Sequence, residues 1–210
     1  MEIFVIGHSN YTFEKLVSML KEHNINVVID MRETPYSVYN TQYNKEIFEI
    51  TIKEAGFIYI YMGHEFGAKR QSRESYTNKV YADFEKVKDE EIFINGIERI
   101  KVGIKKGYKI ALLGAMQDQI RCHRSILIGR VLDRQGIDVK YILHEGGLGN
   151  QEYIEECLLD KYFPNRHQLT LDSLLGNSKS REEMVEEGYK FANRDIGNRT
   201  EGIDKKKHYN

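Results

Sequence analysis

Five short apolar segments that alternate with amphipathic segments constrain the fold of this chain more than any other sequence feature. They are rich in β-branched and aromatic residues, as buried strands are. The five segments are residues 2–6, 26–30, 57–62, 109–113 and 139–143. Strands that alternate with helices form βαβ units with right-handed crossovers, so the pattern predicts an α/β fold. We expect a three-layer, open, mainly parallel sheet of about five strands with helices on both faces.

The sequence between and after these segments predicts the helices and the domain boundaries. Apolar residues at helical spacing predict helices near residues 13–23, 46–55 and 122–136. Residues 71–107 contain no further strong strand and suit one or two amphipathic helices, so we expect a helical insertion, which could cover a site. The expected organisation is an α/β domain over residues 1–148, a helical extension over residues 149–190 and a polar, mobile tail over residues 191–210.

Charge and cysteine content limit the classes of partner and the compartment. The 31 lysines and arginines nearly balance 32 aspartates and glutamates, so a nucleic-acid partner would need a local basic patch rather than bulk attraction. The longest apolar runs fall far short of the roughly 20 residues that span a bilayer, so no membrane partner is expected. Two cysteines and no apolar N-terminal leader predict a reduced, cytoplasmic location. The sequence names no cofactor and leaves the oligomeric state open.

Polar residues gather after the predicted strands. In an open parallel sheet, ligands bind beyond the carboxyl ends of the strands. The residues delivered to that edge are His8, Ser9, Asn10, Asp30, Arg32, His64, Glu65, Gly114, Met116, His144 and Glu145. A further histidine, His123, opens the helix that follows the fourth strand. We therefore expect one polar site on this edge of the sheet.

Cys122, His123 and Arg124 stand at the start of a predicted helix and form the sharpest local motif. A helix N-terminus supplies unpaired amides and partial positive charge, which favour a thiolate or a bound anion. The functional interpretation is an activated thiol or an anion pocket to which Arg124 adds donors. The structural alternative is a buried cysteine that caps the helix, with His123 and Arg124 packed over a loop. The spacing from Cys122 to Arg130 does not match a phosphatase-type loop, which argues against that enzyme class.

The loops after the first two strands contain further polar candidates. Ser9 and Asn10 suit the cap of the next helix, which leaves His8 without a capping role. The glycine before His8 allows close approach of a ligand, but the remaining glycines of a dinucleotide fingerprint are missing. Asp30 and Arg32 lie on the same side of an extended segment, so they form either an ion pair or a joint site.

Basic residues and His-Glu pairs after the third and fifth strands support weaker hypotheses. Lys69 and Arg70, in a stretch that includes tyrosines, could grip phosphates or a single-stranded nucleic acid, although a solvated loop is the plain alternative. The residues that could together hold a metal are His8, Asp30, His64, Glu65, His144 and Glu145. No metal-binding spacing such as HExxH or paired CxxC accompanies them. Cys157 lies beside two leucines and is expected to be a core residue.

In their order along the chain, several short motifs resemble the bacterial family known as domain of unknown function 488. They are Ile6-Gly7-His8-Ser9, Asp30-Met31-Arg32 with Pro35 and Ser37, Phe66-Gly67-Ala68-Lys69-Arg70, Leu112-Leu113 through Cys122-His123-Arg124, and the strand that ends at His144. The resemblance spans about residues 3–148. It implies an α/β fold and a cluster of polar residues, here His8, Ser9, Asp30, Arg32, Ser37, Cys122, His123 and Arg124. The family carries no assigned activity.

The chain departs from the family at the end of the fourth strand. The family usually has Cys-Ala-Glu there, and this sequence has Gly114-Ala115-Met116. A mechanism with two cysteines, a disulfide to Cys122, or a metal held by both positions is therefore not available. Either the family chemistry never needed these groups, or this member has lost or changed it.

The leading hypothesis is an enzyme that acts on an anionic, phosphate-bearing substrate, such as a nucleotide or a nucleic-acid end. The candidate catalytic residues are His8, Asp30, Cys122 and His123. The candidate substrate-binding residues are Ser9, Asn10, Arg32, Ser37, Lys69, Arg70 and Arg124. One alternative is a non-catalytic module that binds a nucleotide or a partner, which the changes at Gly114 and Met116 motivate. The other is a metal-dependent hydrolase that uses His8, Asp30, His64 and His144.

Overall fold

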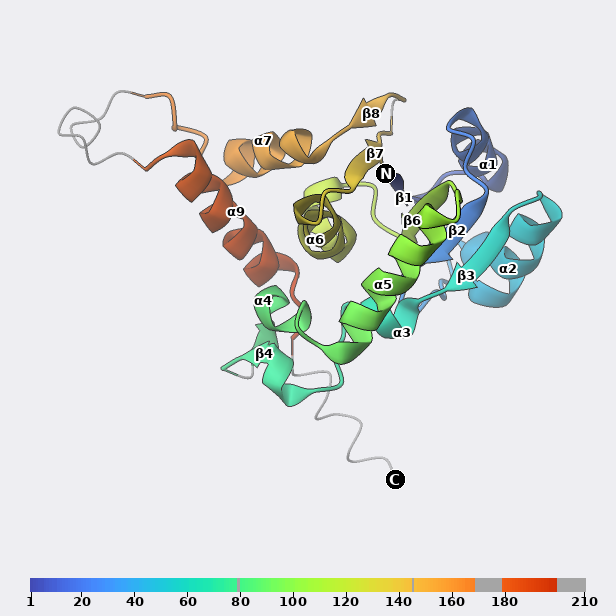
Figure 1. Ribbon diagram of the computed structural model, residues 1–210, viewed down its shortest axis with the longest axis horizontal. Coiled ribbons are helices and arrows are strands. Elements are labelled where there is room, and N and C mark those ends of the chain that lie inside the picture. The colour runs from blue at the N-terminus through green and yellow to red at the C-terminus, as the bar shows by residue number, and fades with distance from the viewer. Residues whose placement is uncertain (79, 145, 169–178, 200–210) are drawn as a thin grey trace.

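The computed structural model describes residues 1–78, 80–144, 146–168 and 179–199 (Figure 1). Its centre is a six-stranded sheet in the order β3-β2-β6-β1-β7-β8. The strands are β1 (Glu2–Gly7), β2 (Val27–Asp30), β3 (Ile58–Tyr61), β6 (Ile110–Gly114), β7 (Asp138–Ile142) and β8 (Leu148–Gly149). The first five strands in this order are parallel, and β8 adds to β7 in the antiparallel direction. The predicted α/β fold is confirmed, with one short strand that the sequence did not indicate.

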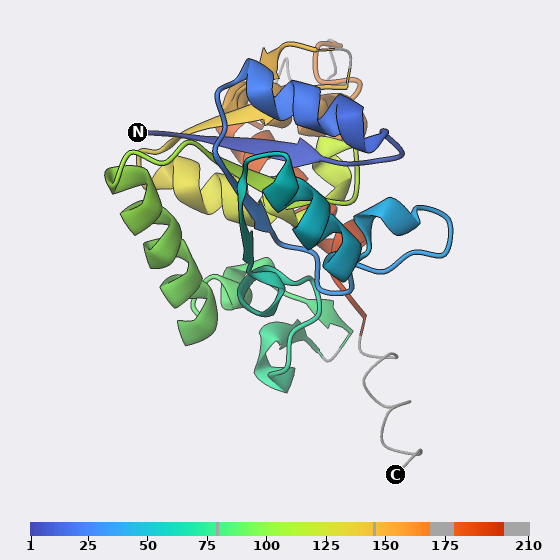
Figure 2. The same cartoon turned by 90° about the vertical axis from the view of Figure 1, so that its right-hand side faces the viewer.

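Helices cover both faces of the sheet and make three layers (Figure 1 and Figure 2). Side chains alternate along each strand, so neighbours such as Ile3 and Phe4 enter cores on opposite faces. One core packs against α1 and α2, and the other against α5 and the helix that follows β6. The bounds are α1 (Phe13–Glu22), α2 (Lys45–Glu54), α5 (Glu91–Lys105), a π-helix over Arg124–Gly129, and α6 (Arg130–Arg134), which continues it.

The helix boundaries follow from caps and apolar stripes. The Thr12 hydroxyl accepts a hydrogen bond from the Lys15 amide at 3.2 Å and starts α1, whose Leu16 and Leu20 are fully buried. Ser180 and Glu183 form a capping box that starts α9 (Arg181–Ile196). Within the described ranges, no helix combines the length and the apolar character that a membrane crossing requires.

The segment over residues 71–107 contains short helices, the longer helix α5 and a small hairpin. Its elements are η2 (Arg73–Ser75), β4 (Tyr76–Thr77), β5 (Tyr81–Ala82), α4 (Phe84–Val87) and α5. Asn193 of α9 holds this segment: its side chain accepts from the Phe84 amide at 3.0 Å and donates to the Ala82 carbonyl oxygen at 2.8 Å. The described part of the insertion does not line the cavity presented below.

The C-terminal helices α7 (Gln151–Tyr162) and α9 belong to the same hydrophobic core as the sheet. A buried hydrogen-bond chain joins them to it, because the Tyr141 hydroxyl donates to Gln151 Oε1 at 2.8 Å and Gln151 Nε2 donates to the Tyr189 hydroxyl. The expected mobile tail from residue 191 is wrong for its first part, since α9 continues to Ile196 with Ala192 fully buried. Residues 169–178, expected in the last helix, and 200–210 lie outside the described residues.

Candidate active site

A cavity of about 1230 Å³ lies beyond the carboxyl ends of the central strands. The helices that follow β1 and β6 pack on opposite faces, and open α/β sheets bind ligands where their connections diverge in this way. The His8 and Ser9 amides donate to the Gly114 and Ala115 carbonyl oxygens at 2.9 Å each, which extends the β1–β6 pairing toward the cavity. The predicted site residues that line it are His8, Ser9, Asn10, Arg32, Ser37, Cys122, His123 and Arg124.

Cys122 provides a buried thiol in the wall of this cavity. Its side chain is 6% exposed, and its carbonyl oxygen accepts from the Ser125 and Ile126 amides at 3.2 Å, so the residue stands at the start of the π-helix. Burial alone would raise the pKa of the thiol. The Arg124 guanidinium and the His123 imidazole outweigh burial and lower the pKa of Cys122 to about 6. At neutral pH the thiolate is therefore the main form.

Arg124 is a fully buried cation that no carboxylate pairs with in the described part of the chain. Its Nη1 lies 3.5 Å from Cys122 Sγ, and its Nη2 donates to Gln119 Oε1 at 3.1 Å. Its Nε is buried without a hydrogen-bond partner. An unpaired charge is costly in a protein interior, so the Cys122 thiolate is the group that compensates this guanidinium.

Two glycines make the space that the Arg124 guanidinium occupies. A Cβ atom at Gly114 would lie 2.5 Å from Arg124 Nη1, and one at Gly7 would lie 2.9 Å from Nη2 and overlap the Met116 carbonyl group. This contact gives a physical reason for a glycine at position 114. With a side chain at position 114, the Arg124 guanidinium could not keep its present position.

His123 and His8 differ in how much of each imidazole is available. His123 lines the cavity, but its Nε2 is buried without a hydrogen-bond partner. His8 uses both ring nitrogens: Nδ1 donates to the Ser9 carbonyl oxygen at 2.8 Å, and Nε2 accepts from Arg32 Nη1 at 3.3 Å. Burial, together with the charge of Arg32, lowers the pKa of His8 to about 4. His8 is therefore a neutral imidazole whose nitrogens are already engaged.

Asp30 and Arg32 form a buried ion pair. Arg32 Nε and Nη2 donate to the two Asp30 carboxylate oxygens at 2.8 and 2.7 Å, and the Tyr59 hydroxyl donates to Oδ2 at 2.9 Å. Arg32 Nη1 also donates to the Tyr43 carbonyl oxygen at 2.7 Å. Asp30 is fully buried and does not line the cavity, whereas Arg32 does. Of the two interpretations from sequence, the structure shows the ion pair, and Asp30 reaches the site only through Arg32.

Lys69, Arg70 and His64 do not join the cavity lining. Arg70 is 5% exposed and forms an ion pair with Glu90, and its Nη1 donates to the Glu65 and Gly67 carbonyl oxygens at 3.1 and 3.0 Å. It thereby ties the single-turn helix α3 (Gly63–Phe66) to the insertion. The expected convergence of Lys69 and Arg70 with the other cations is not found, although Ala68 directly before them lines the cavity.

The metal-centred alternative lacks a ligand set in the part of the chain that the structure describes. No three His, Cys, Asp or Glu side chains gather there as metal ligands would. His8 and His144 line the cavity, but His144 Nδ1 shares a hydrogen bond of 2.5 Å with the Tyr11 hydroxyl, and His64 packs edge-on against Tyr61. Residue 145 of the second His-Glu pair lies outside the described residues.

Ser9, Asn10 and Ser37 shape the loops at the cavity mouth. Ser9 has a φ of 48°, and its hydroxyl contacts Asn10 Oδ1 at 3.3 Å and Gln117 Oε1 at 3.2 Å. Thr12, not Ser9 or Asn10, caps α1. The Ser37 hydroxyl accepts from the Tyr39 and Asn40 amides at 3.2 Å, which orders the loop after β2.

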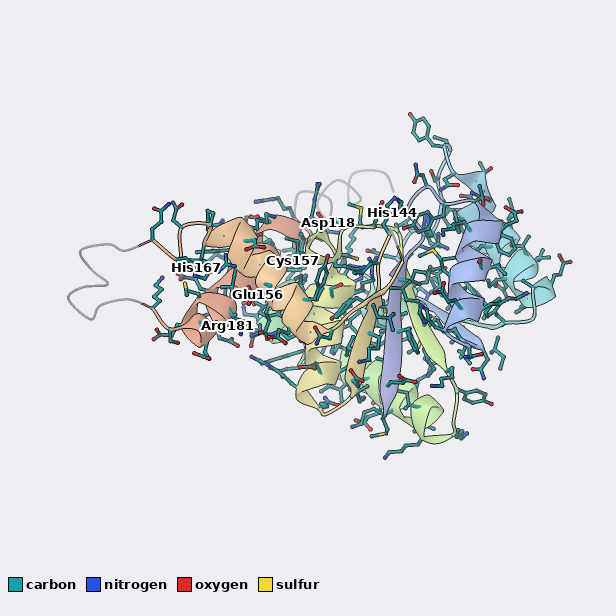
Figure 3. All side chains as sticks on the ribbon, turned by 90° about the horizontal axis from the view of Figure 1, so that it is seen from above. Asp118, His144, Glu156, Cys157, His167 and Arg181 are labelled. Carbon is teal, nitrogen blue, oxygen red and sulfur yellow. The ribbon has the colours of Figure 1, made fainter. Side chains whose placement is uncertain are left out.

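Sequence reasoning missed several lining residues that arrive from separate elements. They include Tyr36, Asn40, Gln117, Asp118, Gln119, Arg121, Tyr153 and Cys157. Cys157 was expected in the core, but it is half-buried and lines the cavity because α7 packs against η3 (Gln119–Arg121). Figure 3 shows Asp118 and Cys157 close together on this side of the molecule, with His144 further along it.

Comparison with known protein families gives one match to this chain. The family model described as "Domain of unknown function DUF488" matches residues 12–131. The chain belongs to this family. The match contains Asp30, Arg32 and the Cys122-His123-Arg124 motif, and it is shorter at both ends than the resemblance over residues 3–148 suggested. Searches of the curated proteins and of the solved structures gave no match.

The neutral state of His8 predicts a pH dependence of stability. The folded pKa of about 4 lies below the ordinary value of 6.5, so the unfolded chain binds more protons in this window. The free energy of unfolding should fall by about 3 kcal/mol as the pH drops from 6.5 through 4. Denaturant unfolding at several pH values measures this slope. His8→Asn, which does not titrate there, should flatten the slope, and equal slopes for both proteins would contradict this assignment.

Proposed function

We propose that this protein is an enzyme that acts on an anionic, phosphate-bearing substrate, such as a nucleotide or a nucleic-acid end, with Cys122 as its nucleophile. The observation that carries the proposal is the buried Cys122 thiol beside the buried Arg124 guanidinium in a large cavity. A thiolate is the nucleophilic form of cysteine, and enzymes obtain it at neutral pH by lowering the pKa with adjacent cations.

The other side chains take roles that follow from their contacts. Arg124 is fully buried, so it acts on the substrate through the thiolate that it holds in the charged state. Arg121 lines the same cavity with an exposed side chain and is placed to meet a phosphate group. His123 lines the cavity and hydrogen-bonds with the Cys122 thiol, so it can exchange a proton with it, whereas His8 keeps Arg32 in place.

The test is the alkylation of Cys122 by iodoacetamide and by the anionic reagent iodoacetate. In a Cys157→Ser background, we expect the alkylation rate to reach half its maximum near pH 6, and iodoacetate to react faster relative to iodoacetamide than it does with free cysteine. Adenosine 5′-monophosphate should protect Cys122 from both reagents. Cys122→Ser is the control that reports the background rate.

A half-maximal rate at pH 8 or above, or the absence of protection by nucleotides and phosphate esters, would count against the proposal. Attack of the Cys122 thiolate on a phosphate ester forms an S–P bond and breaks the P–O bond to the alcohol, which leaves with a proton. Mass spectrometry after incubation with the same compounds looks for this phosphorylated cysteine.

A non-catalytic nucleotide-binding module is the second candidate. The observation in its favour is that Arg32 hydrogen-bonds with both His8 and Asp30. Two of the expected acid-base residues therefore have structural partners already. This candidate requires that Cys122→Ser binds nucleotides as tightly as the parent protein and that the parent protein converts none of them. Isothermal titration of the two proteins, together with product analysis, distinguishes the candidates.

A further inference from the structure

The loop after β2 presents aromatic side chains at the mouth of the cavity. Tyr36 lines the cavity and is 54% exposed, and Tyr39, three residues further on, is 97% exposed. Large aromatic side chains contribute strongly to folding when they are buried, so an ordered loop that leaves two of them in water points to a binding role.

Hydrogen bonds order this loop at both ends and in the middle. The Ser37 amide donates to Asn44 Oδ1 at 2.7 Å, the Lys45 amide donates to the Pro35 carbonyl oxygen at 3.0 Å, and Asn40 Nδ2 donates to the Ser9 carbonyl oxygen at 3.1 Å. The last of these bonds ties the loop to the segment that carries His8.

The ring of Tyr36 is itself held in place. Its hydroxyl donates to Glu46 Oε1 on α2 at 2.7 Å, which fixes one end of the side chain. No other aromatic ring packs against it among the described residues. A flat ring that is anchored at its tip and open on its surface is preorganised for stacking, because little side-chain freedom is lost when a ligand binds.

We propose that Tyr36 is the base-stacking residue of a nucleotide subsite, with the nucleotide either free or at the end of a strand. The inference rests on the proposed function, which places the phosphate near Arg121 and Cys122. Every nucleobase has a π face that stacks on an aromatic side chain. The side-chain amides of Asn10, Asn40 and Gln117 line the same cavity and supply hydrogen-bonding groups for a base or a sugar.

The experiment compares ligands that share a phosphate and differ in the base. Protection of Cys122 from iodoacetamide is titrated with adenosine 5′-monophosphate, ribose 5-phosphate and a 5′-phosphorylated single-stranded DNA. The parent protein should bind adenosine 5′-monophosphate more tightly than ribose 5-phosphate. Tyr36→Ala should weaken binding of the nucleotide by about five- to 100-fold and leave ribose 5-phosphate unchanged.

Two further variants separate stacking from other effects. Tyr36→Phe keeps the ring and loses only the bond to Glu46, so it should retain the preference for the nucleotide. Tyr108, which is 41% exposed and precedes β6 at the opposite edge of the sheet, provides the matched control Tyr108→Ala, with binding unchanged. Thermal unfolding checks that each variant is folded.

The outcomes distinguish the inference from the function on which it rests. Equal protection by adenosine 5′-monophosphate and ribose 5-phosphate, or a nucleotide preference that Tyr36→Ala leaves intact, would overturn the stacking role while the anionic-substrate proposal stands. Protection by none of the ligands would overturn both. Stronger protection by the DNA than by the mononucleotide, lost in Tyr36→Ala, would identify a strand end as the ligand, and protection by the mononucleotide alone would identify a free nucleotide.

Discussion

Asp30→Ala is expected to lower the free energy of unfolding by about 3–5 kcal/mol, because it leaves a buried guanidinium without its counter-ion. Arg32 is 8% exposed and directs two of its nitrogens at the Asp30 carboxylate. The Tyr59 hydroxyl and the Arg32 amide donate to the same carboxylate, so the substitution removes four hydrogen bonds in total. Urea unfolding of the variant and the parent protein measures the difference.

Asp138→Ala is the matched control. Asp138 pairs with Lys140 at 2.9 Å, but its side chain is 54% exposed, and exposed ion pairs contribute little to stability. We expect its effect to stay below about 1 kcal/mol. A similar loss in both variants, or full stability of Asp30→Ala, would show that the buried pair does not hold the site together.

The structural role of Asp30 illustrates what sequence could and could not predict. The strand pattern placed Asp30 and Arg32 at the carboxyl edge of the sheet, and the structure confirms both the fold and the position. Whether two charged residues bind a ligand or each other depends on the surrounding burial. That burial comes from Tyr43 and Tyr59, on segments whose approach the local sequence does not encode.

Because local sequence does not encode how distant segments pack, the sequence analysis also assigned some residues wrongly to the site or to the core. Lys69 and Arg70 follow a strand and α3, but neither lines the cavity, and Arg70 forms an ion pair with Glu90 of the insertion. Cys157 enters the cavity because α7 docks beside the loop after β6. Both outcomes are set by tertiary contacts between segments that are distant in sequence, whereas helix and strand periodicity is a local signal.

The burial of Arg124 depends on a contact that no local pattern reports. Arginine is among the residues least often buried, and the sequence analysis predicts a substrate-binding role for Arg124. Gly7 and Gly114, on two adjacent strands, together leave the room for its guanidinium. Glycine at position 114 therefore leaves room for the guanidinium beside Cys122.

Arg124→Met is expected to raise the pKa of Cys122 from about 6 toward its ordinary value, while His123 continues to lower it. The charge of Arg124 is the largest influence that lowers this pKa, and burial, which opposes it, would remain. The thiolate fraction at pH 7 should fall with this rise, by about tenfold for each unit by which the pKa exceeds 7. Titration of the thiolate absorbance near 240 nm, in a Cys157→Ser background, measures the pKa directly. Methionine fills a buried site without introducing a charge, so we expect the fold to persist.

Arg121→Met separates a buried cation from an exposed one. Arg121 precedes Cys122 in the chain and lines the same cavity, but its side chain is exposed, so solvent screens its charge. We expect the pKa of Cys122 to change little in this variant. If both substitutions shift the pKa of Cys122 equally, the total positive charge around the cavity determines that pKa. The space that Gly7 and Gly114 leave for the Arg124 guanidinium then has no special role. If only Arg124→Met shifts it, the thiolate and the buried guanidinium form one functional pair.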